Sequence, residues 1–231
     1  MKAIVILNLL FSFLNAFSQN APFVVKRINQ PLINKIQNIN DQGLIVWEDE
    51  EFIVSNNCLG EFGGAIIFRE KKTNDEYVCK AQCAKMINKL NGKYYVTVTN
   101  YHGNLFSEII EIENPKSLEK KSSQKSIQDY SSQGSKILLN INDFDILLSF
   151  KYNDELFHII TNDYKAFLIK IENNQYEILN VLSDQNGLYM MSPKIQTIAE
   201  NHFIIFDDDE KDAGFTEVFE NQITINTYKV K

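Results

Sequence analysis

The sequence predicts an all-β protein, a single domain with a propeller-like arrangement of about five short blades. After residue 40, short segments rich in Ile, Val, Phe, Tyr and Thr alternate with Asn, Asp and Gly, as strands and turns do. Segments with helical spacing are scarce. Strand-turn patterns also recur roughly every 42 residues, a length that suits a four-stranded blade. A β-sandwich or an irregular barrel is the alternative arrangement of the same strands.

The first residues predict a secretory signal peptide over residues 1–18. Lys2 precedes a mostly apolar run, and Ala16 and Ser18 occupy the −3 and −1 positions if cleavage precedes Gln19. A membrane anchor is the competing interpretation, but the run is shorter than the ~20 residues that span a bilayer. We therefore expect a secreted or periplasmic protein, with a mature domain at 19–231 and no membrane span after cleavage.

The charge balance excludes one large class of partner. The chain carries 23 Lys and Arg against 30 Asp and Glu, a net charge of −7. Nucleic-acid binding needs a cationic surface that displaces counterions from phosphates. We therefore expect no nucleic-acid partner, which leaves a glycan or another protein.

The expected strands follow one another along the chain with few interruptions. Asn91-Gly92 predicts a tight hairpin turn, because both residues tolerate positive φ. In the strand that follows, alternation places Tyr95, Thr97 and Thr99 on one face and Tyr94, Val96 and Val98 on the other. Strands are expected at 43–49, 51–56, 64–70, 75–79, 83–90, 93–99, 107–113, 136–141, 146–152, 155–161, 166–172, 176–182, 202–208 and 223–230.

Two stretches depart from this pattern. Residues 116–136 are rich in Ser, Lys and Gln and predict an exposed polar loop, here taken as an excursion from one domain rather than a linker between two. Residues 30–40 suit either a short helix or an extended arm.

The blade period is derived by aligning the turn at Asn91 with that at Asn173, and with Asp49 one period earlier.

The cysteines are the only residues assigned to a site. In an exported chain thiols tend to oxidise, and the Cys79–Cys83 spacing fits neither a zinc site nor a C-x-x-C redox centre. We expect a Cys79–Cys83 disulfide that closes a hairpin turn at residues 80–82, with Cys58 free. Pairing of Cys58 with one of the other two is the rival, since connectivity is not encoded in spacing.

Motifs for cofactors and metals are incomplete. Asp207 to Asp212 form an acidic cluster, but the order of ligands in a calcium-binding loop fails at Lys211 and Asp212, so an acidic turn is favoured. The histidines His102, His158 and His202 show no paired metal-ligand spacing. We expect no cofactor and no metal. Tyr94, Tyr95 and Tyr101 suit either a contact surface or packing within a sheet.

Two functions are consistent with these observations. The first is a non-enzymatic secreted or periplasmic β protein that acts by binding a glycan or a protein through its loops. The alternative is an extracytoplasmic hydrolase whose carboxylate acid and base lie on separate loops. No nucleophile motif marks the second, so whether the chain is an enzyme stays open and no catalytic residue is assigned.

Overall fold

The computed structural model describes residues 22–29, 45–59, 63–100, 106–162, 164–184, 188, 193–207 and 214–226. Over these residues the chain is all-β: four sheets follow one another, joined by turns and two short 3-10 segments, and none of the described residues is α-helical. The all-β prediction is therefore confirmed. The expected signal peptide, the segment 30–40, Tyr101, His102 and the acidic residues 208–212 lie outside the described residues.

Sheet I has the strand order β2-β3-β4-β5-β9. Its strands are β2 Ile45–Glu48, β3 Phe52–Cys58, β4 Gly64–Glu70, β5 Glu76–Lys80 and β9 Glu119–Lys120. Sheet II has the order β10-β8-β7-β6. Its strands are β6 Ala84–Leu90, β7 Lys93–Asn100, β8 Phe106–Ile112 and β10 Ser135–Ile141.

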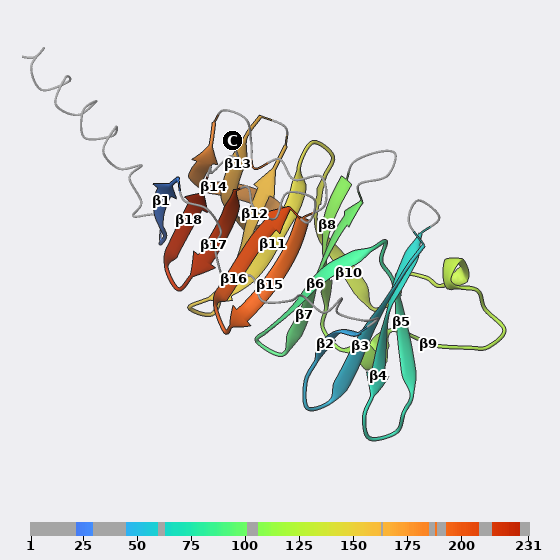
Figure 1. Ribbon diagram of the computed structural model, residues 1–231. Coiled ribbons are helices and arrows are strands. Elements are labelled where there is room, and N and C mark those ends of the chain that lie inside the picture. Colours follow the sequence, from blue (N-terminus) through green and yellow to red (C-terminus); the bar gives the residue numbers. More distant parts are fainter. Residues whose placement is uncertain are drawn as a thin grey trace, which may run out of the picture.

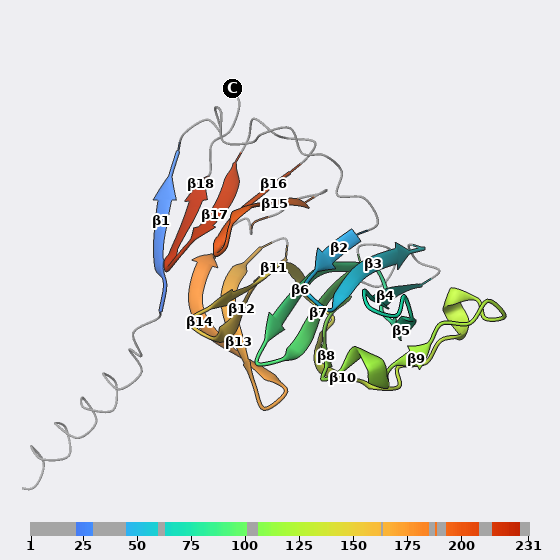
Figure 2. The ribbon, with the colours of Figure 1, turned by 90° about the horizontal axis from the view of Figure 1, so that it is seen from below.

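Sheets III and IV follow the same antiparallel course. Sheet III has the order β11-β12-β13-β14, with β11 Asp145–Tyr152, β12 Glu155–Thr161, β13 Ala166–Glu172 and β14 Gln175–Ser183. Sheet IV contains β15 Pro193–Ala199, β16 His202–Asp207, β17 Phe215–Phe219 and β18 Gln222–Asn226. The N-terminal strand β1, Val24–Ile28, completes sheet IV by pairing in parallel with β18. The four sheets stand one after another along an arc (Figures 1 and 2).

The polar segment between β8 and β10 returns to sheet I. Most of its side chains are exposed, but β9 pairs with β5, and η2 (Pro115–Ser117) and η3 (Ile127–Asp129) flank it. Tyr130 is buried against Ala65, Ile67 and Val78 on the outer face of sheet I. Because this face of sheet I carries apolar side chains that must be buried, the segment covers the face that no other sheet contacts.

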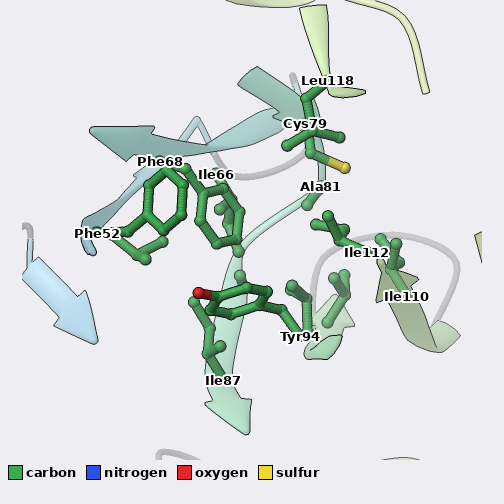
Figure 3. Packing of buried hydrophobic residues seen from close by; sticks show 14 residues of the cluster. Phe52, Ile66, Phe68, Cys79, Ala81, Ile87, Tyr94, Ile110, Ile112 and Leu118 are labelled. Carbon is green, nitrogen blue, oxygen red and sulfur yellow. The ribbon is translucent and has the colours of Figure 1, made fainter. Parts of the chain in front are cut away.

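Alternation along β7 determines how sheet II contacts its two neighbours. Tyr94, Val96 and Val98 pack in one cluster with residues of sheet I, including Phe52 and Phe68. Figure 3 shows Phe68 and Tyr94 side by side in this cluster. Their rings meet edge to face, with centroids 5.3 Å apart and an interplanar angle of 77°. On the opposite face, Thr97 and Thr99 bond to Ser149 and Ile146 of sheet III. The predicted division of this strand into two faces is therefore confirmed.

The positions of the hairpin turns within each sheet show where the predicted blade period of about 42 residues was wrong. The turn at Asn91-Gly92 joins the first two strands of sheet II, and the turn at 49–51 does the same in sheet I. The turn at Asn173-Asn174, however, joins the last two strands of sheet III; the equivalent turn there is Asn153-Asp154. The aligned segments at 90–98 and 172–180 therefore occupy non-equivalent positions in their sheets. The long segment between β8 and β10 makes the chain from sheet II to sheet III longer than one predicted period.

Candidate functional site

The predicted Cys79–Cys83 disulfide is wrong. Cys58 and Cys83 are bonded, with Cα atoms 4.5 Å apart, and Cys79 is a buried free thiol. The prediction failed because residues 80–82 are not a hairpin turn: they carry the chain from β5 in sheet I to β6 in sheet II. Cys79 faces the core between these sheets (Figure 3), where burial raises the pKa of its thiol.

The disulfide is possible because two connections approach closely beside Gly64. The amide of Ala81 donates to the carbonyl of Gly64, at 3.1 Å. A Cβ at Gly64 would lie 2.7 Å from the carbonyl oxygen of Asn57 and 3.0 Å from that of Ala81. Only glycine tolerates this approach, which brings the end of β3 next to Cys83. The bond thus links sheet I to the start of sheet II.

A buried serine–histidine pair lies between sheets II and III. Thr97 Oγ1 donates to Ser149 Oγ at 2.6 Å, and Ser149 Oγ lies 2.8 Å from His158 Nδ1. A serine next to an imidazole is the arrangement of nucleophilic catalysis. Both side chains are fully buried, and burial lowers the pKa of His158 to about 3. In this structure the pair is a buried cross-strand contact within sheet III, and Thr97 of sheet II packs against it.

Asp49, Lys89 and Tyr94 form a second polar cluster, between sheets I and II. Asp49 accepts hydrogen bonds from Lys89 Nζ at 2.5 Å, from Tyr94 OH at 2.9 Å, and from the amides of Glu51 and Phe52. Burial alone raises the pKa of Asp49, but these bonds hold it below its usual range; burial raises the pKa of Tyr94 to about 12. Both side-chain donors and both amides bond to Asp49, so the cluster fixes the β2–β3 turn.

The other histidine and tyrosine candidates that lie in the described residues make contacts within the fold. His202 Nε2 lies 2.9 Å from Glu217 Oε1, and its ring packs on that of Phe219 within sheet IV. Tyr94 is core, and Tyr95 donates to Glu111. In the described part of the chain, His, Cys, Asp and Glu side chains nowhere gather in threes as a metal site requires.

The clearest exposed feature is an apolar strip on β14, the outermost strand of sheet III. Tyr176, Ile178 and Val181 are 40%, 47% and 51% exposed. In regular alternation Ile178 and Val181 would face opposite sides. The register of β14 against β13 shifts between the pairs Asn180–Leu168 and Ile178–Ile169, so that Val181 lies opposite Phe167. We call Tyr176, Ile178 and Val181 the β14 strip.

Sequence reasoning missed the β14 strip for a local reason. "YEILNVL" has the composition of an interior strand, and neither the irregular pairing nor the outermost position is visible in it. Leu179 and Leu182, between and beside the exposed residues, do pack into the core shared by sheets III and IV. The apolar side chains of β14 are therefore divided between the core and the surface.

Comparisons with protein-family models, curated proteins and solved structures found no match. Across the described ranges, none of the elements is a helix of the length and apolarity that a membrane crossing requires.

Proposed function

We propose that this chain is a secreted or periplasmic, non-enzymatic β protein that binds a protein partner through the β14 strip. The observation that carries the proposal is the exposure of three large apolar side chains on one face of an outermost strand. Grouped apolar side chains at a surface are typical of protein contacts, whereas single exposed ones are ordinary. Two of the three are aliphatic, which suits a protein partner better than a glycan.

Several features support the compartment, the sheet arrangement and the non-enzymatic role that this proposal assumes. The Cys58–Cys83 disulfide is typical of an oxidising compartment. The signal-peptide pattern at 1–18 predicts export to such a compartment. We infer a propeller-like arrangement because each sheet contributes a four-stranded antiparallel unit and successive sheets pack face to face. The hydrolase alternative gains no support from Ser149 and His158, because a substrate would not reach fully buried side chains.

Export and disulfide pairing are tested together. We expect the protein recovered from its native host to begin at or near Gln19, since Ala16 and Ser18 provide the small residues of a cleavage site. Non-reducing peptide mapping should find Cys58 joined to Cys83, with Cys79 alkylated only after unfolding. Recovery of intact Met1 from the membrane fraction would contradict export, and a Cys79–Cys83 peptide would contradict the pairing.

Binding is tested by photo-crosslinking in the native host. A benzophenone-bearing phenylalanine analogue at Tyr176 should give one cross-linked protein species, because this position lies in the strip. The same analogue at Tyr164, 71% exposed beyond the end of β12, is the matched control and should give none. Ile178→Ser should abolish the cross-link from position 176. Equal cross-linking from both positions, or none from either, would contradict the proposed function.

A further inference from the structure

We propose that the partner is held by strand addition. On this view an extended segment of another protein, with apolar side chains at alternate positions and basic residues at its ends, pairs with the outer edge of β14 between Gln175 and Val181. This inference rests on the proposed function and specifies the chemistry of its partner.

The edge of β14 is open over most of its length. β14 pairs with β13 on one side and is the last strand of sheet III in the described chain. Along such an edge, alternate amides and carbonyls point away from the sheet and are able to pair with another strand. Arg27 of β1 donates to the carbonyl of Leu182 at 2.9 Å, which ends the open stretch at Val181.

Other sheets of the same molecule show that a strand fits at this outer edge. Sheets I and IV each gain a fifth strand there, β9 and β1 respectively. These added strands are themselves protected: β9 has only Glu119 and Lys120, and β1 carries Lys26 and Arg27. Charged residues and short length are the usual protections of an edge.

β14 has little of this protection. It has nine residues, of which Glu177 is the only charged one, and it contains neither Pro nor Gly. The other open outer edge in the described chain, β10 of sheet II, also carries one charged residue, Lys136, but is shorter at seven residues. β14 is therefore the sheet edge best suited to accept a strand.

The irregular register gives an added strand a continuous apolar surface. Because the pairing shifts beside Ile178, the β14 strip lies on the face that Phe167 and Ile169 share. Those two side chains belong to the cluster between sheets II and III. Alternate apolar side chains of an added strand would lie beside the strip as cross-strand neighbours, extending this cluster outward.

The charge around the strip determines which occupant fits. Glu172 and Glu177 lie at one end and Asp184 at the other, and all three are exposed. Lys165, also exposed, lies near Asp184, because it precedes the Ala166 that pairs with Ser183. Acidic side chains still outnumber basic ones around the strip. Lys170 is engaged by Glu155 at 2.6 Å and by Glu172 at 3.1 Å. A second copy of the chain that paired in parallel through β14 would bring Glu177 and Asp184 against their own counterparts. Complementarity therefore favours a segment with basic ends from a different protein.

The experiment uses the full mature chain and a defined probe. The probe is a decapeptide of alternating threonine and valine with two lysines at each end. We expect it to bind, and at saturation to slow hydrogen exchange of amides in 175–181 at least tenfold, because outward-pointing amides gain acceptors. Two control peptides should bind at least tenfold more weakly: one N-methylated at alternate residues, and one with glutamates in place of the lysines.

Matched variants locate the binding edge. Ile178→Ser together with Val181→Ser should weaken peptide binding at least tenfold. Ile137→Ser on β10, where the side chain is 49% exposed, should leave binding within twofold. Folding of each variant is checked by circular dichroism, and a variant that fails to fold is replaced by Ile178→Thr or by Val181→Thr alone.

The outcomes separate this inference from the proposed function. Peptide binding without slowed exchange in β14, or equal binding of the N-methylated peptide, overturns strand addition. Failure of the peptide to bind, alongside a cross-link from position 176, also overturns strand addition but leaves the proposed function intact. A dimer of this chain that protects β14 without peptide shows that the occupant is a second copy. Absence of both peptide binding and cross-link overturns both proposals.

Discussion

Replacement of Phe23 by alanine should lower the free energy of unfolding by about 3–5 kcal/mol, the usual cost of removing a large aromatic side chain from a core. Phe23 is 3% exposed although it lies just before the first strand. Its ring centroid lies 5.0 Å from that of Phe157, 5.5 Å from that of Phe150 and 5.1 Å from that of Tyr152. All three neighbours belong to sheet III, whereas β1 belongs to sheet IV, so Phe23 joins two sheets.

The measurement is chemical denaturation of the unsubstituted chain and of the variant. Val24→Ala is the matched control, because Val24 is the next residue but is 54% exposed. We expect the control to change the free energy of unfolding by less than about 0.5 kcal/mol, as is usual for surface substitutions. A Phe23→Ala variant as stable as the control would show that the N-terminal residues do not dock between sheets III and IV. The predicted cleavage site lies only a few residues earlier, so export would leave this anchor in place.

The second large effect is a loss of stability in acid caused by His158. Burial lowers the pKa of this imidazole from 6.5 to about 3. In the unfolded chain the ring takes up a proton below pH 6.5, whereas in the folded chain it stays neutral until about pH 3. The neutral ring therefore contributes stability that is present above pH 6.5 and is lost as the pH falls from 6.5 to about 3. Over this interval one proton changes the free energy of unfolding by roughly 5 kcal/mol.

This effect is isolated by measuring the free energy of unfolding against pH for His158→Asn. Asparagine places a polar atom near the position of Nδ1, so the contact with Ser149 is kept while the titrating ring is removed. The variant should show a shallower loss of stability between pH 6.5 and 3 than the unsubstituted chain. His202→Asn is the control, since that ring is partly exposed in sheet IV. Equal slopes for all three proteins would contradict a neutral, buried His158.

The same residue illustrates why the sequence did not identify this contact. "LFHIIT" predicts a strand, and His158 does lie in β12. The partner Ser149 lies on the neighbouring strand, and Thr97 lies in another sheet. His158 Nε2 is buried without a hydrogen-bond partner in the described part of the chain. The pairing of β11 with β12 places Ser149 opposite His158, and the packing of sheet II on sheet III adds Thr97.

Short-range chemistry explains the parts of the fold that the sequence predicted well. The Asn91-Gly92 turn forms as expected, with φ of 50° and 78°, because both residues accept positive φ. The strands with clear alternation, such as β7, form as expected because side-chain direction follows position along the strand. Four strands were not predicted: β1, β9, β15 and β17. Each of the first two is short and charged, and is a strand only because a partner sheet supplies its hydrogen bonds.

The sequence by itself determined the all-β class, the order of most strands and the two faces of β7, because these depend on neighbouring residues. Tertiary structure alone decided that Cys83 bonds to Cys58, since the connection from β5 to β6 leaves one sheet for the next. It also decided that Tyr176, Ile178 and Val181 share an exposed face, since the irregular register depends on how β14 meets β13. Disulfide partners and exposed edges are set by contacts between segments far apart in the chain, and local residue patterns do not encode those contacts.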